Sequence, residues 1–370
     1  MLEPSASLLG PMAQALSPEK YTVGWICPLA KEFTAGRAMF DEFHDDLQSQ
    51  NLPHDSNRYA LGKIGSYNAV MACLPAGHIG TSLARDVAGN MRRSFPNIRY
   101  FLLVGIGGGV PSYGPPGDRR EIVLGDVVVG TGIVQTGFGA HAIDGFRITR
   151  HLYPPPMDLL NAVTWLRSDH EMKSRTRMPQ FIECMLENIA EEKRGAYRHQ
   201  GNDRLYQAHY PHQRENWECE ECCDPQELVG RSPRKSTGPE VHYGFIASAD
   251  HLMVNAVLRD KLQAELQVIC FEMEAAGLNM LPFLAIRGIC DYADSHKNKK
   301  WQEYAAATAA AYTKELLYTI PQSVVGSQGN LGTRELHSEG AYRDKIHFPR
   351  CMAGKETQIR WQTTITTNII

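Results

Sequence analysis

The sequence predicts a single α/β domain, and three observations support this prediction. Short β-branched and aromatic runs alternate with segments of helical apolar spacing along much of the 370 residues. Hydrophobic residues make up 43% of the chain, which is enough for a large core. The alternation stops near residue 167 and returns near residue 240, which indicates one irregular insertion within one domain.

The first half of the predicted domain follows a Pro-, Ser- and Ala-rich segment, residues 1–20, that we expect to be a loose leader. The apolar run 98–104 is typical of a strand buried on both faces of a sheet. In order, we expect a strand over 21–27, a helix over 29–40, strands over 59–64 and 68–74, a helix over 81–95, the strand over 98–104, β structure over 121–129, and a helix from the prolines at 154–156 through residue 166.

The second half begins with the charged insertion, 167–240, in which only 178–189 has a helical pattern. Beyond it we expect strands over 243–247, 268–271 and 283–290, helices over 255–266 and 274–281, and an Ala-rich helix over 300–317. Pro321 closes the domain, which therefore spans 21–321. The Gly-, Ser- and Thr-rich segment 322–370 has no clear period and is expected to be a poorly ordered tail.

Composition excludes several classes of function. A net charge of −3 argues against a nucleic-acid binder, because phosphate affinity comes from clustered Lys and Arg. No apolar run approaches the ~20 residues of a membrane helix, and residues 1–20 lack the basic start of a signal peptide. Nine scattered cysteines, an odd number, do not resemble a disulfide framework. We therefore expect a soluble, cytoplasmic enzyme.

A glycine segment, Gly105-Ile-Gly-Gly-Gly109, follows the predicted buried strand. Glycines let a backbone approach a ligand closely, so Gly107 and Gly108 are candidate substrate-binding residues in a loop. A dinucleotide site is excluded because Val110-Pro111 cannot open a helix, and a phosphate-binding NTPase loop is excluded because no Gly-Lys-Ser/Thr follows. A tight turn without a ligand stays open as an alternative.

Carboxylates stand at the ends of two consecutive predicted strands. Glu272 and Glu274 flank Met273 just after one strand, and Asp291 ends the next. Buried carboxylates are costly without partners, and ligands bind at strand ends in α/β sheets. If the two strands are parallel, these acids reach the same edge of the sheet. A solvated first helical turn or a helix cap is the alternative reading.

The three motifs, Gly105-Ile-Gly-Gly-Gly109, Phe271-Glu-Met-Glu-Ala275 and Arg287-Gly-Ile-Cys-Asp291, occur in the order found in a known family. In this the chain resembles the nucleoside phosphorylase/nucleosidase superfamily, of purine nucleoside phosphorylase and methylthioadenosine nucleosidase type. The likeness is greatest to the fungal branch, often an N-terminal domain of immune-receptor-like proteins. The resemblance implies a central, mixed, twisted sheet flanked by helices, a purine nucleoside or nucleotide as substrate, a homo-oligomer and no cofactor.

The resemblance also implies roles for the acidic residues. Cleavage of a ribosyl–purine bond passes through an oxocarbenium-like state, and the leaving base must accept a proton. Asp291 matches the general acid near N7 of the purine. Glu274 matches the residue that binds the ribose hydroxyls, Met273 would pack under the sugar, and Glu272 would support them. Arg287 could bind an anion or hold Glu272.

Two further loops extend the resemblance. Ser248-Ala-Asp-His-Leu-Met253 resembles the base-binding loop, which makes Ser248, Leu252 and Met253 candidates for purine contact. Leu252 occupies a position that is aromatic in bacterial methylthioadenosine nucleosidases, so aliphatic packing would replace stacking. Glu32 matches the water-activating glutamate of nucleosidases, whereas phosphorylases tend to carry an arginine in this loop. Hydrolysis is therefore favoured.

Two other readings of the function stay open. The first is phosphorolysis, with phosphate as co-substrate, and an exposed helical Glu32 would leave it possible. The second is a non-catalytic module that senses a nucleoside or signals. The joint presence of Glu32, Glu274 and Asp291 argues against that module.

Two features outside these motifs carry potential ligands. His209 and His212 precede Cys219, Cys222 and Cys223 in the insertion, an inventory that suits tetrahedral zinc. Their spacing is not that of a standard zinc finger, so a metal-free thiol loop is the favoured reading. The loop after Asp291 carries His296, Lys297, Lys299 and Lys300, which predicts attraction for an anionic group such as a 5′-phosphate.

Overall fold

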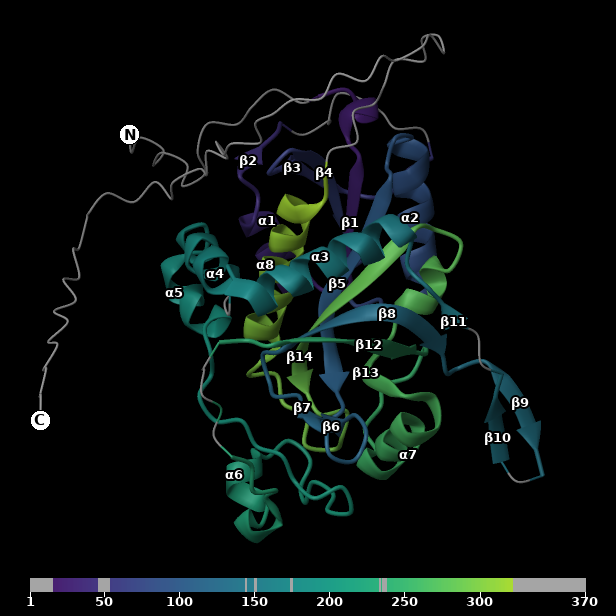
Figure 1. Ribbon diagram of the computed structural model, residues 1–370, viewed down its shortest axis with the longest axis vertical. Helices are drawn as coiled ribbons and strands as arrows, with labels where there is room; N and C mark the ends of the chain where they lie inside the picture. The colour runs from purple at the N-terminus through teal and green to yellow at the C-terminus, as the bar shows by residue number, and fades with distance from the viewer. Residues whose placement is uncertain are drawn as a thin grey trace, which may run out of the picture. The chain divides into compact units, whose positions relative to one another are not determined.

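A mixed sheet of ten strands forms the centre of the described part of the chain (Figure 1). The computed structural model describes residues 16–45, 54–143, 145–149, 152–173, 176–232, 234 and 238–321. The α/β class, the single domain and the mixed central sheet expected from the sequence are confirmed. The expected tail, 322–370, and the expected leader up to residue 15 lie outside the described residues.

The sheet closes on itself, a feature that the sequence does not predict. β14 (Phe283–Asp291) pairs in parallel with β5 (Tyr100–Gly109) on one side and antiparallel with β8 (Val127–Gln135) on the other. β8 pairs with β12 (Val241–Ser248), β12 with β13 (Val268–Glu272), and β13 with β5. These five strands therefore form a closed barrel.

The remaining strands of the sheet extend from the barrel. β1 pairs in parallel with β5 and with β4, which continues antiparallel into β3 and β2, while β11 pairs with β8. Their bounds are β1 (Val23–Cys27), β2 (Glu42–Phe43), β3 (Tyr59–Ile64), β4 (Tyr67–Cys73) and β11 (Leu152–Tyr153).

Helices cover this sheet, and α8 (Gln302–Thr319) packs closely on β14 and β5. A methyl group on Gly288 of β14 would lie 1.8 Å from the Ala305 carbonyl oxygen, so glycine and alanine together bring helix and sheet into contact. The other longer helices are α1 (Ala30–Ala38), α2 (Thr81–Ser94), α3 (Met157–Lys173), α4 (Met178–Glu187) and α7 (Ala256–Leu266). None of the described helices is long and apolar enough to cross a membrane.

Two local expectations are wrong. The helix expected over 274–281 is a single 3₁₀ turn, η4 (Ala275–Leu278). The Glu272 carboxylate accepts the N–H groups of Glu274 and Ala275 at 3.0–3.1 Å and holds the start of this turn. After Leu278 the helix does not continue, because the Leu281 N–H binds the Leu278 carbonyl oxygen at 2.8 Å in a tighter turn that leads into β14. The β structure expected over 121–129 is interrupted, since the five residues 122–126 separate β7 (Arg120–Glu121) from β8. β7 pairs instead with β6 (Ser112–Tyr113) in a small hairpin.

The segment 167–240 begins as helical structure on the core. Arg167 lies inside α3, and both α3 and α4 pack on α8. Short elements follow, with longer irregular stretches between them: α5 (Glu191–Arg194), η2 (Gly195–Tyr197), α6 (Cys219–Cys222) and η3 (Pro225–Glu227). A further two-stranded hairpin, β9 (Gly139–Ala142) and β10 (Gly145–Ile148), projects away from the sheet (Figure 1).

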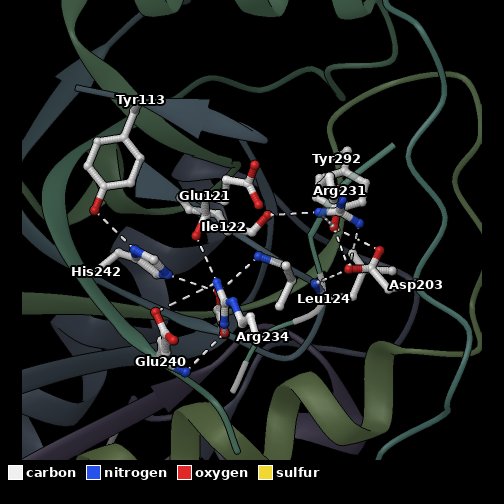
Figure 2. Close-up of polar contacts among 12 residues, drawn as sticks. Tyr113, Glu121, Ile122, Leu124, Asp203, Arg231, Arg234, Glu240, His242 and Tyr292 are labelled. Atoms are coloured by element: carbon white, nitrogen blue, oxygen red, sulfur yellow. Dashed lines mark hydrogen bonds and ion pairs between the residues drawn. The ribbon is translucent and has the colours of Figure 1, made fainter. Parts of the chain in front are cut away.

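Two arginines near the end of the segment 167–240 bind it to the barrel (Figure 2). Arg234 donates to both carboxylate oxygens of Asp126, each at 2.7 Å. Arg231 lies 2.9 Å from Asp203 Oδ2 and donates to the Tyr292 hydroxyl oxygen at 2.8 Å. Tyr292 directly follows Asp291, so the segment 167–240 positions the chain at the end of β14.

Candidate active site

A cavity of about 230 Å³ opens where β5, β13 and β14 end. Ten of the eleven candidate catalytic and substrate-binding residues from the sequence line it: Glu32, Gly107, Gly108, Leu252, Met253, Glu272, Met273, Glu274, Arg287 and Asp291. Ser248 does not line the cavity. Its side chain is fully buried, and its Oγ accepts the Ala276 N–H at 2.9 Å, which makes it a support for η4.

The glycine segment is part of β5, not a loop. Gly105 to Gly109 have no left-handed φ, so their lack of a side chain serves to leave space. A methyl group on Gly105 would lie 2.6 Å from both Glu32 Oε1 and Arg287 Nη1, and one on Gly108 would lie 2.7 Å from Asp291 Oδ1. The glycines thus make room beside β5 for the acidic side chains.

Glu32 is a buried carboxylate held by two backbone amides. Its Oε2 accepts the Leu29 N–H at 2.6 Å, and its Oε1 accepts the Ile106 N–H at 2.7 Å. The first bond closes the N-terminal turn of α1, and the second reaches β5 through the space left at Gly105. Both bonds fix the carboxylate at the cavity wall instead of leaving it in solvent, where an ordinary helical glutamate would lie.

One buried guanidinium compensates three carboxylates. Arg287 Nη2 forms an ion pair with Glu272 Oε2 and lies 3.5 Å from Glu274 Oε2, while the Glu32 carboxylate adds a further attraction. Glu274 Oε1 also accepts the Gly80 N–H at 3.3 Å, at the start of α2. Arg287 therefore holds the acidic side chains together, the role the sequence offered as its alternative to anion binding.

Burial shifts the titration of this cluster. Desolvation raises the pKa of Glu32 to about 8 and that of Glu274 to about 7, although the Arg287 charge opposes both shifts. The same carboxylates raise the pKa of Arg287 despite its burial. The cluster therefore holds exchangeable protons near neutral pH, which is the range in which general acids and bases work.

Asp291 lies at the cavity, but the arrangement of strands that places it there differs from the one expected. β13 runs antiparallel to β5 while β14 runs parallel to it, so the two acidic strand ends are not parallel neighbours. They converge because Phe271 and Asp291 pair with Gly108 from opposite sides of β5. Asp291 Oδ1 accepts the Ala293 N–H at 2.8 Å, and Lys297 Nζ lies 3.1 Å from the same oxygen.

Lys297 is a cavity residue for which the sequence predicts another role. Of the four basic residues expected to attract an anion, it is the one that lines the cavity. Lys300 instead lies 2.9 Å from Glu218 Oε2, and Lys299 is exposed. A substrate phosphate would have to compete with Asp291 for Lys297, so the structure does not favour the predicted anion site.

Several apolar residues of the cavity escape sequence reasoning. Phe271 lines it from β13, although the sequence presents this residue as strand core, and Thr136 and Ile79 contribute from segments without a motif. Leu252 is 57% exposed, so it forms part of the rim. Phe271 is thus an aromatic residue at the cavity, although residue 252 is aliphatic. Its position beside Glu272 is the one signal that could have identified it.

Of the five residues in the sequence-based zinc hypothesis, three gather away from the cavity. His212, Cys219 and Cys223 lie together, and His296 joins them from the loop after β14. His209 points elsewhere, with its Nε2 3.5 Å from Glu227 Oε2. Cys222 contacts His212 Nε2 at 3.6 Å but lies outside the set of four.

Comparisons with known structures place the fold among nucleosidases. The chain superposes on the 5′-methylthioadenosine/S-adenosylhomocysteine nucleosidase of Helicobacter pylori with a TM-score of 0.51 at 15% identity, over 80% of this chain and 98% of that one. It superposes on the futalosine hydrolase of the same organism with a TM-score of 0.50 at 16% identity, over 80% and 97%. The chain therefore has the α/β fold of these nucleosidases.

One sequence relative is a much longer protein. Over 325 residues the chain is 42% identical to a nucleotide-binding leucine-rich repeat (NLR)-like protein of Hyaloscypha variabilis, a match that covers 84% of this chain. The chain spans 30% of the length of that relative. No protein-family model matches the chain.

Proposed function

We propose that the protein hydrolyses the N-glycosidic bond of a purine nucleoside and releases the free base. The observation that carries the proposal is the placement of Asp291, Glu274 and Glu32 around one cavity beside β5. The nucleosidase fold supports it, because the same class of reaction is named for the similar solved structures. Membership of the nucleoside phosphorylase/nucleosidase superfamily is part of this proposal.

Each carboxylate has a distinct task in the proposed reaction. Asp291 donates a proton to the purine nitrogen as the bond between C1′ and the base breaks. Glu274 accepts hydrogen bonds from the ribose hydroxyls, and Met273 packs against the sugar. A water molecule attacks C1′ and gives a proton to Glu32, whose oxygens keep free lone pairs beside their two backbone bonds.

The charge distribution supports water over phosphate as the nucleophile. Arg287 and Lys297 are the Lys and Arg side chains that line the cavity among the described residues, and each lies against carboxylates. A phosphate dianion near Glu32 would have to compete for Arg287, which already pairs with Glu272 and Glu274. Water needs only an acceptor for its proton, which Glu32 supplies.

The test is release of free base from a panel of purine nucleosides and their 5′-substituted and 5′-phosphorylated forms, with and without phosphate. We expect phosphate-independent release with free ribose, or its 5′-substituted form, as the second product. An absolute requirement for phosphate, with a sugar 1-phosphate as product, would contradict hydrolysis. Asp291→Asn serves as the inactive control in the same assay.

A second candidate function, nucleoside sensing, is supported by the NLR-like relative. In that reading the chain binds a nucleoside in the same cavity and passes the signal to other parts of a larger protein. Calorimetric binding of a nucleoside by the wild type, without any release of base from that nucleoside, would favour sensing over hydrolysis.

A further inference from the structure

Four metal-ligating side chains gather on the side of the insertion that faces the loop after β14. His212, Cys219 and Cys223 come from the segment between α4 and β12, and His296 comes from the loop between β14 and α8. One ligand atom from each lies within 4.8 Å of those of the other three. Two parts of the chain more than seventy residues apart thus supply one compact donor set.

The distances fit a tetrahedral ion. Cys219 Sγ lies 3.7 Å and Cys223 Sγ lies 3.8 Å from His296 Nδ1. Bonds of ~2.3 Å to sulfur and ~2.0 Å to nitrogen at tetrahedral angles separate S and N ligands by about 3.5 Å. The two sulfur-to-nitrogen distances therefore exceed this separation by only 0.2–0.3 Å, and all four donor atoms lie within 4.8 Å of one another.

The surroundings of His296 orient it as a metal ligand. Its Nε2 lies 2.9 Å from the Tyr210 carbonyl oxygen, which can only accept, so Nε2 carries the proton and Nδ1 presents its lone pair to the two sulfurs. The Tyr206 ring stacks on the imidazole with centroids 4.1 Å apart. A backbone carbonyl bound to the second ring nitrogen is the usual outer partner of a zinc-bound histidine.

We propose that His212, Cys219, Cys223 and His296 bind one structural Zn²⁺ ion. Two thiolates and two imidazoles are the Cys₂His₂ set that zinc takes in closed structural sites. On binding, each thiol loses its proton to solvent and the resulting thiolate bonds to the metal, with no change of oxidation state. Four protein ligands leave no position for a substrate.

The ion would cross-link the insertion to the loop that carries Lys297. His296 directly precedes Lys297, the residue that pairs with Asp291, and Tyr292 of the same loop is already held by Asp203 and Arg231. The insertion would thereby fix both ends of the short segment after β14. This role is structural and does not depend on the reaction proposed for the cavity.

The first experiment measures zinc bound to the full-length chain, purified without affinity metals or chelators. We expect one zinc per chain by elemental analysis, and after exchange for Co²⁺ the thiolate charge-transfer and visible bands of a tetrahedral site. The proposal is wrong if the chain holds far less than one zinc, both as purified and after reconstitution with Zn²⁺ under reducing conditions. This result does not depend on whether any substituted variant folds.

The second experiment distinguishes this ligand set from the low-ranked candidates that the sequence offers, which include His209 and Cys222 and lack His296. Cys223→Ser and His296→Gln are expected to lose the metal, whereas the matched controls Cys222→Ser and His209→Gln are expected to retain it. In addition, a strong chelator should lower the melting temperature of the wild type and leave that of Cys223→Ser unchanged. Retention of zinc by Cys223→Ser and His296→Gln would show that the four residues are not the ligands.

Discussion

Lys297 Nζ lies 3.1 Å from Asp291 Oδ1, so the carboxylate at the end of β14 is paired with a cation from the loop that follows it. The Ala293 N–H binds the same oxygen, and Cys290 Sγ lies 3.3 Å from Oδ2. Asp291 is therefore held by its own sequence neighbourhood, whereas Glu32, Glu272 and Glu274 are held by Arg287. The cavity has two separate electrostatic centres, which separate substitutions can probe.

Asp291→Asn is expected to lower the rate of base release ~10²- to 10⁴-fold, the contribution of general acid catalysis. The side chain keeps its shape and still accepts from the Ala293 N–H, so melting temperature and nucleoside binding should change little. Asp260→Asn, at an aspartate that is 48% exposed on α7, is the matched control and should retain full activity. A wild-type rate in Asp291→Asn would remove this residue from the mechanism.

The activity of the wild type should rise with pH through about 8. Burial raises the pKa of Glu32 to about 8, and a base must be ionised before it can accept a proton from water. Steady-state base release measured from pH 6 to 9.5 should show this limb in kcat/KM. In Glu32→Gln this rise of kcat/KM with pH should disappear together with most of the activity. A wild-type kcat/KM that does not change across this pH range would contradict the role of Glu32 as the base.

The same pKa predicts a pH dependence of stability. The pKa of Glu32 is about 8 in the folded chain, whereas its ordinary value is 4.5. Between these two pH values the folded state therefore binds the Glu32 proton more tightly than the unfolded state does. The unfolding free energy contributed by this group is therefore fully present below about pH 4.5 and falls as pH rises to about 8. Between pH 4.5 and 8, the melting temperature of Glu32→Gln should fall less than that of the wild type. The melting temperature of the exposed control Glu265→Gln should change with pH as that of the wild type does.

Gly105→Ala should destabilise the fold by about 1–3 kcal/mol, the usual cost of overpacking. Its methyl group would lie 2.6 Å from Glu32 Oε1 and from Arg287 Nη1, and both side chains are fixed by their partners. Gly195→Ala is the matched control, because no atom lies within 4 Å of the added methyl group and its φ of −56° suits alanine. Denaturant unfolding of the two variants measures the difference, and equal stabilities would contradict the role assigned to the glycines.

Tyr292→Phe should cost about 0.5–1.5 kcal/mol, the net value of a hydrogen bond. Its hydroxyl bridges Arg231 and both oxygens of Asp203, so the variant loses a contact between the insertion and the barrel (Figure 2). Limited proteolysis should then cut the segment 198–232 faster than in the wild type. Unchanged proteolysis would show that Arg231 and Asp203 hold the segment without the tyrosine.

The sequence predicts most of the elements because their signals are local. Alternating and helical apolar patterns identify β3, β4, α2, α4 and α7 within a few residues. Barrel closure has no local signal, since it depends on β14 pairing with both β5 and β8 across long chain separations. The sequence overestimates the length of η4, because its apolar spacing continues to Leu281, whereas the backbone turns after Leu278 with the Leu281 N–H bound to the Leu278 carbonyl oxygen.

The residues around the cavity could be selected from motifs, but their physical roles could not. The purpose of Gly105 and Gly108 is visible only when Glu32 and Asp291 are seen against β5. Lys297 has the composition of a solvated loop residue, and its contact with Asp291 depends on how the loop folds back. Cys223 and Cys222 are adjacent in the chain, so only the turn of α6 decides which of them faces His296.

Barrel closure also has a consequence for the time scale on which the cavity can open. Each of β5, β14, β8, β12 and β13 is hydrogen-bonded on both sides, so no one of them can detach without breaking a ladder with two neighbours. Amide hydrogens of β5 and β14 should therefore exchange with solvent deuterium only through global unfolding, whereas those of the insertion exchange through smaller local openings. The wall that holds Glu32, Arg287 and Asp291 would then be among the slowest-exchanging parts of the chain, and access to the cavity would depend on motion of the surrounding loops.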